Sequence, residues 1–331
     1  MNKKNLSFLM IGTLIYGILG CEEGELDPNK AGLLVPKTVV ENSLLPSIKV
    51  NNILLHAEAF GNPTNPILLV LHGGPGGDYR YLLNCKKFVD DGFYVVFYDQ
   101  RGSGLSQRLS KESYKINQME KEVGNVINYY RKSPNQKVFI LGHSWGGILA
   151  TAYINANPTK VNGAIIAEPG GLTWQDIKDY IGRSQKFDFT SEALNDATYQ
   201  DQFLTGDEDQ HEILDYKFSL FASEEKDSTV GNEGLTSYWR YGSVIQQALF
   251  DLGEKEKPDW TINLSQFKTK ILFVYSQNNK AYGEAHAKKV SSAYPNVQVE
   301  LTKDAGHNMI SFEKGWQNFY PVAKTYLNSL K

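Results

Sequence analysis

The stretch ILGHSWGGILA, residues 140–150, places a serine between glycines, with an apolar run on either side. We expect a strand over 137–141 and a helix over 147–156, so Ser144 would lie on a sharp strand-to-helix turn that exposes its hydroxyl. A nucleophilic serine needs a base, an acid that orients the base, and donors for an oxyanion. A glycine-rich packing turn is the alternative interpretation of the same pattern.

Short apolar runs bounded by turn residues recur along the chain, at 53–60, 67–71, 93–98, 137–141, 163–167, 270–275 and 297–302. Several of them, such as ILLVL and YVVFY, are apolar throughout, which is typical of strands buried on both faces of a sheet. Residues 116–130 carry apolar side chains at helical spacing. Strands that alternate with helices predict an α/β fold, with a mostly parallel sheet flanked by helices.

The first 21 residues have a different character. An apolar stretch of about 14 residues follows two lysines and ends at Cys21, which is too short to cross a bilayer and is typical of a signal peptide. The tail ILGC resembles a bacterial lipobox, which implies lipidation of Cys21 once residues 1–20 are removed. A plain secretory signal that contains a cysteine is the alternative. We therefore expect an exported, membrane-anchored bacterial lipoprotein, on the periplasmic or cell-surface side, with a lipid-anchor tether over 21–44.

The composition argues against several classes of protein. Over 331 residues the formal net charge is −3, and no cluster of lysine and arginine marks a nucleic-acid surface. After removal of residues 1–20 and lipidation of Cys21, Cys85 is the one cysteine left, so no disulfide is expected. No set of histidine, cysteine and carboxylate residues has the spacing of a metal site, so neither a metal nor another cofactor is expected.

Residues 172–260 interrupt the alternation of strands and helices. The segment has no strand-like run and holds 19 acidic residues against 8 lysines and arginines. We expect a mostly helical cap, inserted between the two parts of an α/β core at 45–171 and 261–331. The acidity of this cap has two interpretations, a solvated surface or an entrance that favours cationic substrates.

Two other glycine-rich stretches follow expected strands. LVLHGGPGG, residues 69–77, leaves backbone N–H groups free to point at a ligand oxygen, and the N–H of Gly74 is expected to form an oxyanion hole with that of Trp145. His72 is expected to fix this loop and not to act as the base. YDQRGSGLS, residues 98–106, is expected to form a tight, charged turn beside the site.

The motifs HGGPG, DQRGSG-x-S and G-x-S-W-G-G, in this order and at these separations, resemble the α/β-hydrolase fold. Within that fold they resemble the prolyl iminopeptidase group of serine peptidases. The resemblance covers roughly residues 45–170 and 265–330, with 172–260 in the place of the family's helical cap. It implies a serine hydrolase in which Ser144 attacks a carbonyl, and a small molecule or a short peptide as substrate.

The predicted base is His307, in LTKDAGHNM directly after the expected strand 297–302. The other histidines that could be considered are expected to be structural or exposed: His56, His143, His211 and His286. In the family the acid normally follows the penultimate strand, but the matching residue here is Asn279, followed by Lys280. The family's Trp-Glu pair in the cap is also absent, because Arg240 follows the tryptophan.

An amide cannot stabilise an imidazolium as a carboxylate does, so we expect the acid elsewhere. VNGAIIAEPGG ends its apolar run at Glu168, at the end of the strand after the nucleophile helix. The position resembles that of the acid in a haloalkane dehalogenase subgroup, and a charge at the end of a buried strand needs a partner. Glu168 is therefore the predicted triad acid. Pairing with a cap residue or simple capping of the strand is the alternative, and Asp304 and Glu284 are less well placed candidates.

The predicted function is hydrolysis by acyl transfer through Ser144. The first choice is an aminopeptidase of the prolyl iminopeptidase kind that acts on short peptides. A carboxylesterase-like hydrolase of small acyl compounds is an alternative, favoured by Lys280. A catalytically inactive binding protein on a hydrolase scaffold is another, favoured by the amide at Asn279.

Overall fold

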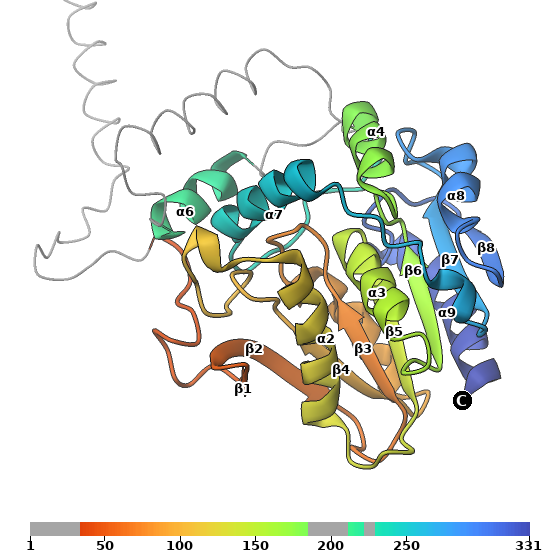
Figure 1. Cartoon of the computed structure of the whole chain (residues 1–331), viewed down its shortest axis with the longest axis horizontal. Coiled ribbons are helices and arrows are strands. Elements are labelled where there is room, and N and C mark those ends of the chain that lie inside the picture. The colour runs from red at the N-terminus through yellow and green to blue at the C-terminus, as the bar shows by residue number, and fades with distance from the viewer. Residues whose placement is uncertain (1–33, 185–210, 222–228) are drawn as a thin grey trace, which may run out of the picture. The chain divides into compact units, whose positions relative to one another are not determined.

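The computed structural model describes residues 34–184, 211–221 and 229–331 (Figure 1). Within these ranges one sheet has the strand order β1-β2-β4-β3-β5-β6-β7-β8. Its strands are β1 (Ser47–Val50), β2 (Ile53–Phe60), β3 (Ile67–Leu71), β4 (Tyr94–Tyr98), β5 (Val138–His143), β6 (Gly163–Ala167), β7 (Ile271–Ser276) and β8 (Val297–Thr302). The β1–β2 and β2–β4 pairs are antiparallel and the other pairs are parallel. The predicted α/β fold with a mostly parallel sheet is confirmed.

Strand β1 was not predicted from the sequence. Its residues, SIKV, alternate between exposed and buried, and a run of 4 residues is too short to stand out. It joins β2 through Asn51 and Asn52, whose φ values are +50° and +65°. Two consecutive left-handed residues are what a two-residue hairpin turn requires, and asparagine tolerates this conformation better than most residues.

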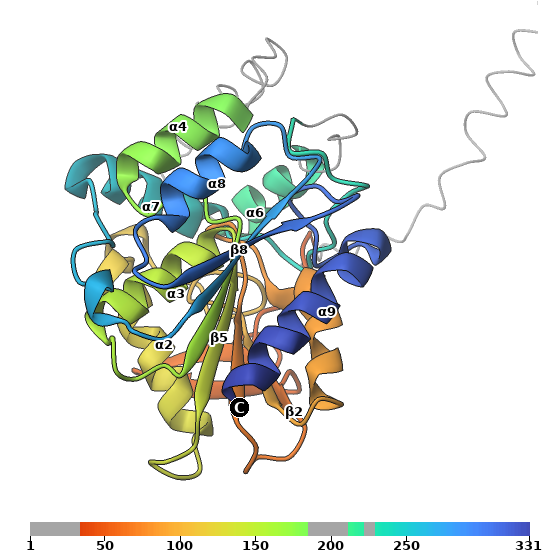
Figure 2. The ribbon, with the colours of Figure 1, turned by 90° about the vertical axis from the view of Figure 1, so that its right-hand side faces the viewer.

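Helices cover both faces of the sheet (Figure 2). On one face α2 (Ile116–Tyr130), α3 (Trp145–Ala156) and α8 (Gly283–Ser291) bury alternate strand side chains, such as Leu69 and Ile140. On the other face, η1 (Tyr79–Val89) and α9 (Glu313–Leu330) bury the side chains between them, such as Val70 and Leu141. Strands β3 to β6 are buried along their whole length, which explains their uninterrupted apolar runs.

Three helices of the segment expected as a cap lie beyond the carboxyl ends of the parallel strands, α4 (Trp174–Ser184), α6 (His211–Phe221) and α7 (Ser243–Glu256) (Figure 1). The short turns η2 (Lys111–Ser113) and η4 (Leu264–Gln266) complete the elements of the described residues. The two ends of the segment meet, since Thr173 and Asp259 form a bridge and the Trp260 N–H donates to the Leu172 carbonyl at 3.0 Å. The boundaries at 172 and 260 remain a prediction.

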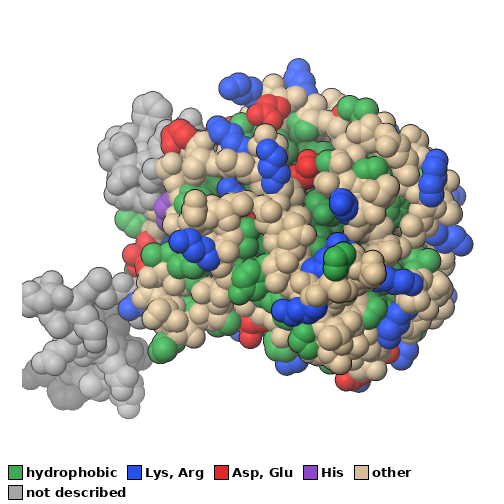
Figure 3. Space-filling model, turned by 60° about the horizontal axis from the view of Figure 1, so that its bottom comes forward, with side chains coloured by type: hydrophobic (Ala, Val, Ile, Leu, Met, Phe, Trp, Pro, Cys, Tyr) green, Lys and Arg blue, Asp and Glu red, His purple; other side chains and the backbone are tan. Residues whose placement is uncertain are grey.

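Charge is unevenly distributed along the chain. The 172–260 segment is strongly acidic, whereas on the face turned away from its helices lysine and arginine side chains are spread widely and acidic ones are few (Figure 3). The expected signal peptide, Cys21 and the first part of the expected tether lie outside the described residues. In the part of the chain that the structure describes, no helix is long and apolar enough to span a membrane.

Candidate active site

Ser144 lies between the last residue of β5 and the first residue of α3. Its backbone has φ +55° and ψ −125°, a conformation that residues other than glycine seldom adopt. A Cβ added at Gly142 would clash with the carbonyl of Gly146, and one added at Gly146 would clash with the carbonyl of Leu71. Glycine is therefore required on both sides of the serine, which is the physical content of the Gly-x-Ser-x-Gly pattern.

The strand ends of β5 and β6 bring Ser144 and Glu168 side by side. The Ser144 N–H donates to the carbonyl of Ala167 at 2.9 Å, and the N–H of Glu168 donates to the carbonyl of Val274 at the same distance. Glu168 also has left-handed backbone, with φ +42°. Strained residues persist where surrounding contacts fix them, and they are enriched at functional sites.

Glu168 and His307 are in direct contact. Oε2 of Glu168 lies 2.7 Å from Nδ1 of His307; the carboxylate is fully buried, and the histidine side chain is 15% exposed. A carboxylate at Nδ1 fixes the orientation of the ring and leaves Nε2 available to a substrate or nucleophile. The structure therefore brings the predicted acid and base together, although their catalytic roles remain a prediction. The other two candidates lie elsewhere, since Asp304 is exposed and Glu284 pairs with Lys288 on α8.

Residues at the end of β7 hold the Glu168 carboxylate. Its Oε1 accepts hydrogen bonds from the backbone N–H and the hydroxyl of Ser276, both at 2.6 Å. Its Oε2 accepts a bond from the side-chain amide of Asn279 at 2.9 Å, beside the contact with His307. The residue at the family's usual acid position is thus an amide that donates to the carboxylate of Glu168. Sequence reasoning missed both donors.

Two backbone N–H groups close to Ser144 in the sequence or the cavity wall are those predicted to bind an oxyanion. Gly74, in the loop after β3, has φ +127°, and Trp145 is the first residue of α3, so its N–H lies outside the helical hydrogen bonds. Within the described residues neither N–H donates to another group. The N–H of Gly73, in contrast, donates to the hydroxyl of Tyr81 at 2.7 Å. The role of the first two in an oxyanion hole remains a prediction.

His72 fixes the glycine loop, as expected. Its Nδ1–H donates to the carbonyl of Gly73 at 2.8 Å, and its Nε2 accepts the N–H of Gln100 at 3.0 Å. Burial lowers the pKa of His72, so the ring remains neutral in this arrangement. The side chain of Gln100 in turn accepts a bond from the indole of Trp145 at 2.9 Å. The turn over 98–106 therefore holds the glycine loop and the indole of Trp145 in place.

His143 connects the glycine loop to the loop of His307. Its Nδ1 lies 2.8 Å from the hydroxyl of Tyr81, and its Nε2 lies 2.7 Å from the backbone carbonyl of His307. Nε2 must donate to that carbonyl, so Nδ1 accepts the hydroxyl proton. Burial, together with the neighbouring imidazole, lowers the pKa of His143 to about 3. His143 is therefore a neutral structural residue.

Two of the remaining histidines also have structural partners. His56 contacts the carboxylate of Asp99 at 2.7 Å, and both side chains are buried. His286 lies 2.8 Å from the carbonyl of Gly170, and burial lowers its pKa. His211 begins helix α6. None of these three lines the cavity that contains Ser144.

Ser144, His307 and Gly74 line one cavity of about 270 Å³. Aromatic side chains and uncharged polar ones make up much of its wall: Tyr81, His143, Phe218, Asn232, Thr236, Tyr238, Tyr241 and Asn308. The rings of Phe218 and Tyr241 are stacked with centroids 3.9 Å apart. Among the described residues that line this cavity, none is aspartate or glutamate.

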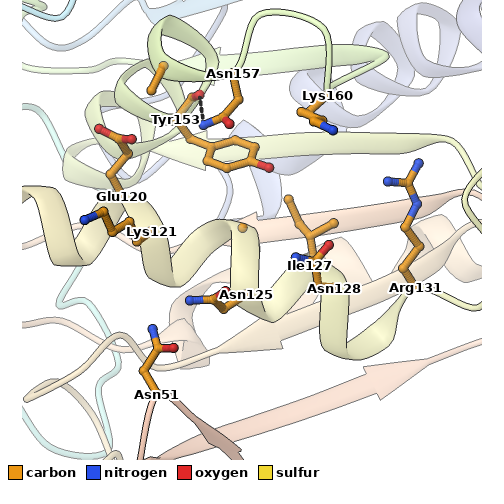
Figure 4. A pocket seen from close by; sticks show the side chains of 12 residues that line it. Asn51, Glu120, Lys121, Asn125, Ile127, Asn128, Arg131, Tyr153, Asn157 and Lys160 are labelled. Carbon is orange, nitrogen blue, oxygen red and sulfur yellow. Dashed lines mark hydrogen bonds between the residues drawn. The ribbon is translucent and has the colours of Figure 1, made fainter.

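A second hollow, of about 620 Å³, lies between α2 and α3 (Figure 4). Asparagines and basic residues line much of it, including Asn125, Asn128, Arg131 and Lys160. It shares no described lining residue with the cavity at Ser144. Although it is larger, it contains no serine, cysteine or histidine among its described lining residues, so we place the candidate active site at Ser144.

Asp78 is a buried residue that sequence reasoning missed. Its Oδ2 accepts the N–H groups of Trp239 and Arg240, at 2.6 and 3.1 Å. Residues 238–242, which we call the inner cap segment, are attached to the glycine loop at two further points, because the Gly242 N–H donates to the Gly76 carbonyl and the Tyr241 hydroxyl donates to the Pro75 carbonyl. The wall of the cavity and the loop of Gly74 are therefore joined.

The model of the alpha/beta hydrolase fold family matches residues 66–314, most of the chain. The chain belongs to the α/β-hydrolase fold family. Among curated relatives of this chain, a protein named "Probable aminopeptidase" from Bacillus subtilis is 42% identical over 101 residues, 28% of this chain and 31% of its own. The proline iminopeptidase of Thermoplasma volcanium is 39% identical over 107 residues, 32% of this chain and 35% of its own. Each match thus spans about a third of the relative.

Solved structures similar to this chain share its fold. The proline iminopeptidase of Mycobacterium smegmatis has a TM-score of 0.58 at 16% identity, over 86% of this chain and 98% of its own. An esterase of Exiguobacterium antarcticum has a TM-score of 0.58 at 17% identity, over 86% and 99%. At these identities the likeness extends to the fold alone, and it does not separate a peptidase from an esterase.

Proposed function

We propose that this member of the α/β-hydrolase fold family is a serine hydrolase that acts by acyl transfer through Ser144. The observation that carries the proposal is the 2.7 Å contact between Glu168 and His307, at a cavity that Ser144 also lines. Nucleophile, base and acid follow β5, β8 and β6 respectively, so their positions are fixed by strands of one sheet. Rigid elements hold such groups better than isolated loops do.

In the proposed reaction, the Ser144 hydroxyl attacks the acyl carbon while Nε2 of His307 takes its proton. The Glu168 carboxylate stabilises the imidazolium through Nδ1. The N–H groups of Gly74 and Trp145 stabilise the oxyanion of the tetrahedral intermediate. His307 then protonates the leaving group, and water releases the acyl group from Ser144 by the same steps in reverse.

The first proposed substrate is the N-terminal residue of a short peptide. The names of the curated relatives support this choice, because they describe aminopeptidases and proline iminopeptidases. The acidity of residues 172–260 also supports it, since a negative entrance favours a free amine. Hydrolysis of aminoacyl-arylamides, compared between the wild type and Ser144→Ala, tests the choice.

The second candidate is a small carboxylic ester. It is favoured by the cavity wall, where the described residues offer no carboxylate for an amine. The described residues of the wall offer no arginine or lysine for a carboxylate either, because the guanidinium of Arg240 pairs outside the cavity with the buried carboxylate of Asp215 at 2.7 Å. Lys280, which favoured an ester in the sequence, is exposed and is not part of the cavity wall. A panel of short acyl esters, run beside the arylamides, decides between the candidates.

The alternative of an inactive scaffold is tested by covalent labelling. A fluorophosphonate probe should label the wild type, and Ser144→Ala should abolish the labelling and lower turnover by about 10⁶, as in a comparable triad. An unlabelled wild-type protein with intact fold would favour a binding protein. Normal labelling of Ser144→Ala would show that another residue is the nucleophile.

Export and lipid anchoring are proposed on the sequence alone, because Cys21 lies outside the described residues. The short apolar run that ends in Gly-Cys supports them. Cys21→Ser should release the protein from membranes or block its maturation. An unmodified Cys21 in the intact mass of the native protein would contradict the anchor.

A further inference from the structure

We propose that Asn279 is a positioning residue: it orients Glu168 toward His307 and keeps a second carboxylate out of the site. The inference rests on the proposed function. Asn279 is 1% exposed, and its amide nitrogen lies 2.9 Å from Oε2 of Glu168. It occupies the position at which the resemblance implied an acid, so its role in this chain differs from the one that position suggests.

The hydrogen bonds leave the Glu168 carboxylate little freedom to rotate. Both donors of Ser276 bind Oε1, whereas Oε2 is shared by the amide of Asn279 and Nδ1 of His307. A carboxylate oxygen accepts about two such bonds. The bond from Asn279 occupies one acceptor site of Oε2, so the remaining acceptor site of Oε2 is directed at the imidazole of His307.

The orientation of the Asn279 amide follows from its own partners. Its Oδ1 accepts the backbone N–H of Tyr282 at 3.2 Å, so its NH₂ group must face Glu168. That NH₂ group also lies 3.1 Å from the hydroxyl of Tyr180, on α4. A residue at 279 therefore has to accept on one side and donate on the other, which asparagine does.

An aspartate at 279 would keep the shape and the acceptor but lose the donor. Its second oxygen would lie near 2.9 Å from Oε2 of Glu168, the present distance of the amide nitrogen. Two buried carboxylates this close cannot both be ionised without a nearby positive charge. Either they share a proton, or a neighbouring group takes up a proton and becomes positively charged. The neighbour is the imidazole of His307, and a protonated imidazole cannot act as the base.

Other ionisable groups lie around the pair: His143, Asp176, Tyr180, Arg183, Lys280, Tyr282 and His286. Burial lowers the pKa values of His143 and His286, and burial and Glu168 raise that of Tyr282. These three therefore stay uncharged near neutral pH. A change in the pH profile on substitution of residue 279 is accordingly assigned to Glu168 and His307.

The test is the pH dependence of kcat/KM for Asn279→Asp. We expect its acidic limb to move to higher pH by about one unit, with a loss of about tenfold or more below neutral pH. A titration of the His307 ring followed by NMR should move in the same direction. Profiles that superimpose on those of the wild type would overturn the proposal.

Two further comparisons separate positioning from general stability. Gln136→Glu makes the same amide-to-carboxylate change at a buried position before β5, where the side chain bonds to Pro63 and Asn65; it should lower Tm without moving the pH profile. If Asn279→Asp does not fold, Asn279→Ala, which removes the donor without adding a charge, should lower kcat, and an unaltered kcat would overturn the proposal.

A double-mutant cycle identifies the route through which Asn279 acts. Asn279→Ala should lower kcat in the wild type but have no further effect in Glu168→Gln, because the group it positions is gone. Additive losses would contradict the proposal. Failure of the proposed function can be told apart from failure of this inference. If the probe does not label wild-type Ser144, the NMR titration of His307 in Asn279→Asp still reports whether residue 279 acts on the Glu168–His307 contact.

Discussion

The carboxylate of Glu168 determines how the individual residues of the site are arranged. It faces His307 and is bound by donors from β7, while its own backbone is strained. We predict that Glu168→Gln lowers kcat by roughly 10³–10⁴, by analogy with the Asp-to-Asn change in the serine-protease triad. The measurement is kcat on the best substrate of the ester and arylamide panel. Glu284→Gln, an exposed change of the same kind, should leave kcat unaltered, and a loss below tenfold in Glu168→Gln would argue for another acid.

His143 gives a second prediction at this scale. Its pKa is about 3 in the folded protein against about 6.5 in an unfolded chain, so below pH 6.5 the unfolded state binds a proton that the folded state does not. The free energy of unfolding should therefore fall as pH decreases from 6.5 to about 3, by up to about 1.4 kcal/mol per pH unit from this residue. Urea unfolding of His143→Gln should show a shallower fall than the wild type between pH 6.5 and 4. Equal slopes would contradict the assignment.

Residues in local motifs were predictable, whereas their distant partners were not. Ser144 lies in a glycine pattern, His307 follows the last strand, and Glu168 ends an apolar run, so each has a local signal. The donors Ser276 and Asn279 are more than 100 positions from Glu168. Their pairing depends on the order of β6 and β7 in the sheet, which no local pattern specifies.

At the scale of elements, the junction of β5 and α3 is the part that tolerates substitution least. We predict that Gly146→Ala destabilises the fold by several kcal/mol, because its Cβ would clash with backbone at the end of β3 that cannot move aside. Gly182→Ala is the matched control in α4, where nothing lies within 4 Å of the added Cβ. That change should stabilise by roughly 0.5–1 kcal/mol through helix propensity. Denaturant midpoints of the two variants show whether the first change destabilises the fold and the second stabilises it.

Elements with a long apolar run were predicted well, and short or charged ones were not. The buried strands β3 to β6 stand out because both of their faces are covered. Strand β1 has one covered face and only 4 residues. The turn over 98–106 lies beside the site, as expected, since Gln100 bonds to His72 and Trp145. The sequence did not show that its charged residues Arg101 and Asp99 are buried and paired with Glu122 and His56. Their charges stabilise the turn and do not face the cavity.

For the whole molecule, the acidity of residues 172–260 predicts an effect of salt. A cationic aminoacyl-arylamide should have a kcat/KM that falls as salt rises, by about tenfold at most, whereas its N-acetylated form should respond little. Stopped-flow or steady-state rates between low and high ionic strength provide the measurement. Equal kcat/KM for the two forms, at all salt concentrations, would favour the ester as substrate.

The acidic residues of the segment do not all contribute to that field. Asp215 in α6 is fully buried and is paired with Arg108 at 3.0 Å and with Arg240 at 2.7 Å. It also accepts the N–H of Ser243 at 2.9 Å, so it connects α6 to the start of α7. Counting charges along the sequence could not separate this residue from solvated ones, because its partners lie far away in the chain.

The attachment of the inner cap segment to the glycine loop has a consequence for protein engineering. Residues 238–242 belong in sequence to the expected cap, 172–260, but their bonds to Asp78, Pro75 and Gly76 make them part of the support of the glycine loop. A chimera that replaced all of 172–260 would therefore remove the support together with the cap. A graft that introduces new substrate preferences has to retain residues 238–242 together with Asp215 of α6, the buried partner of Arg240.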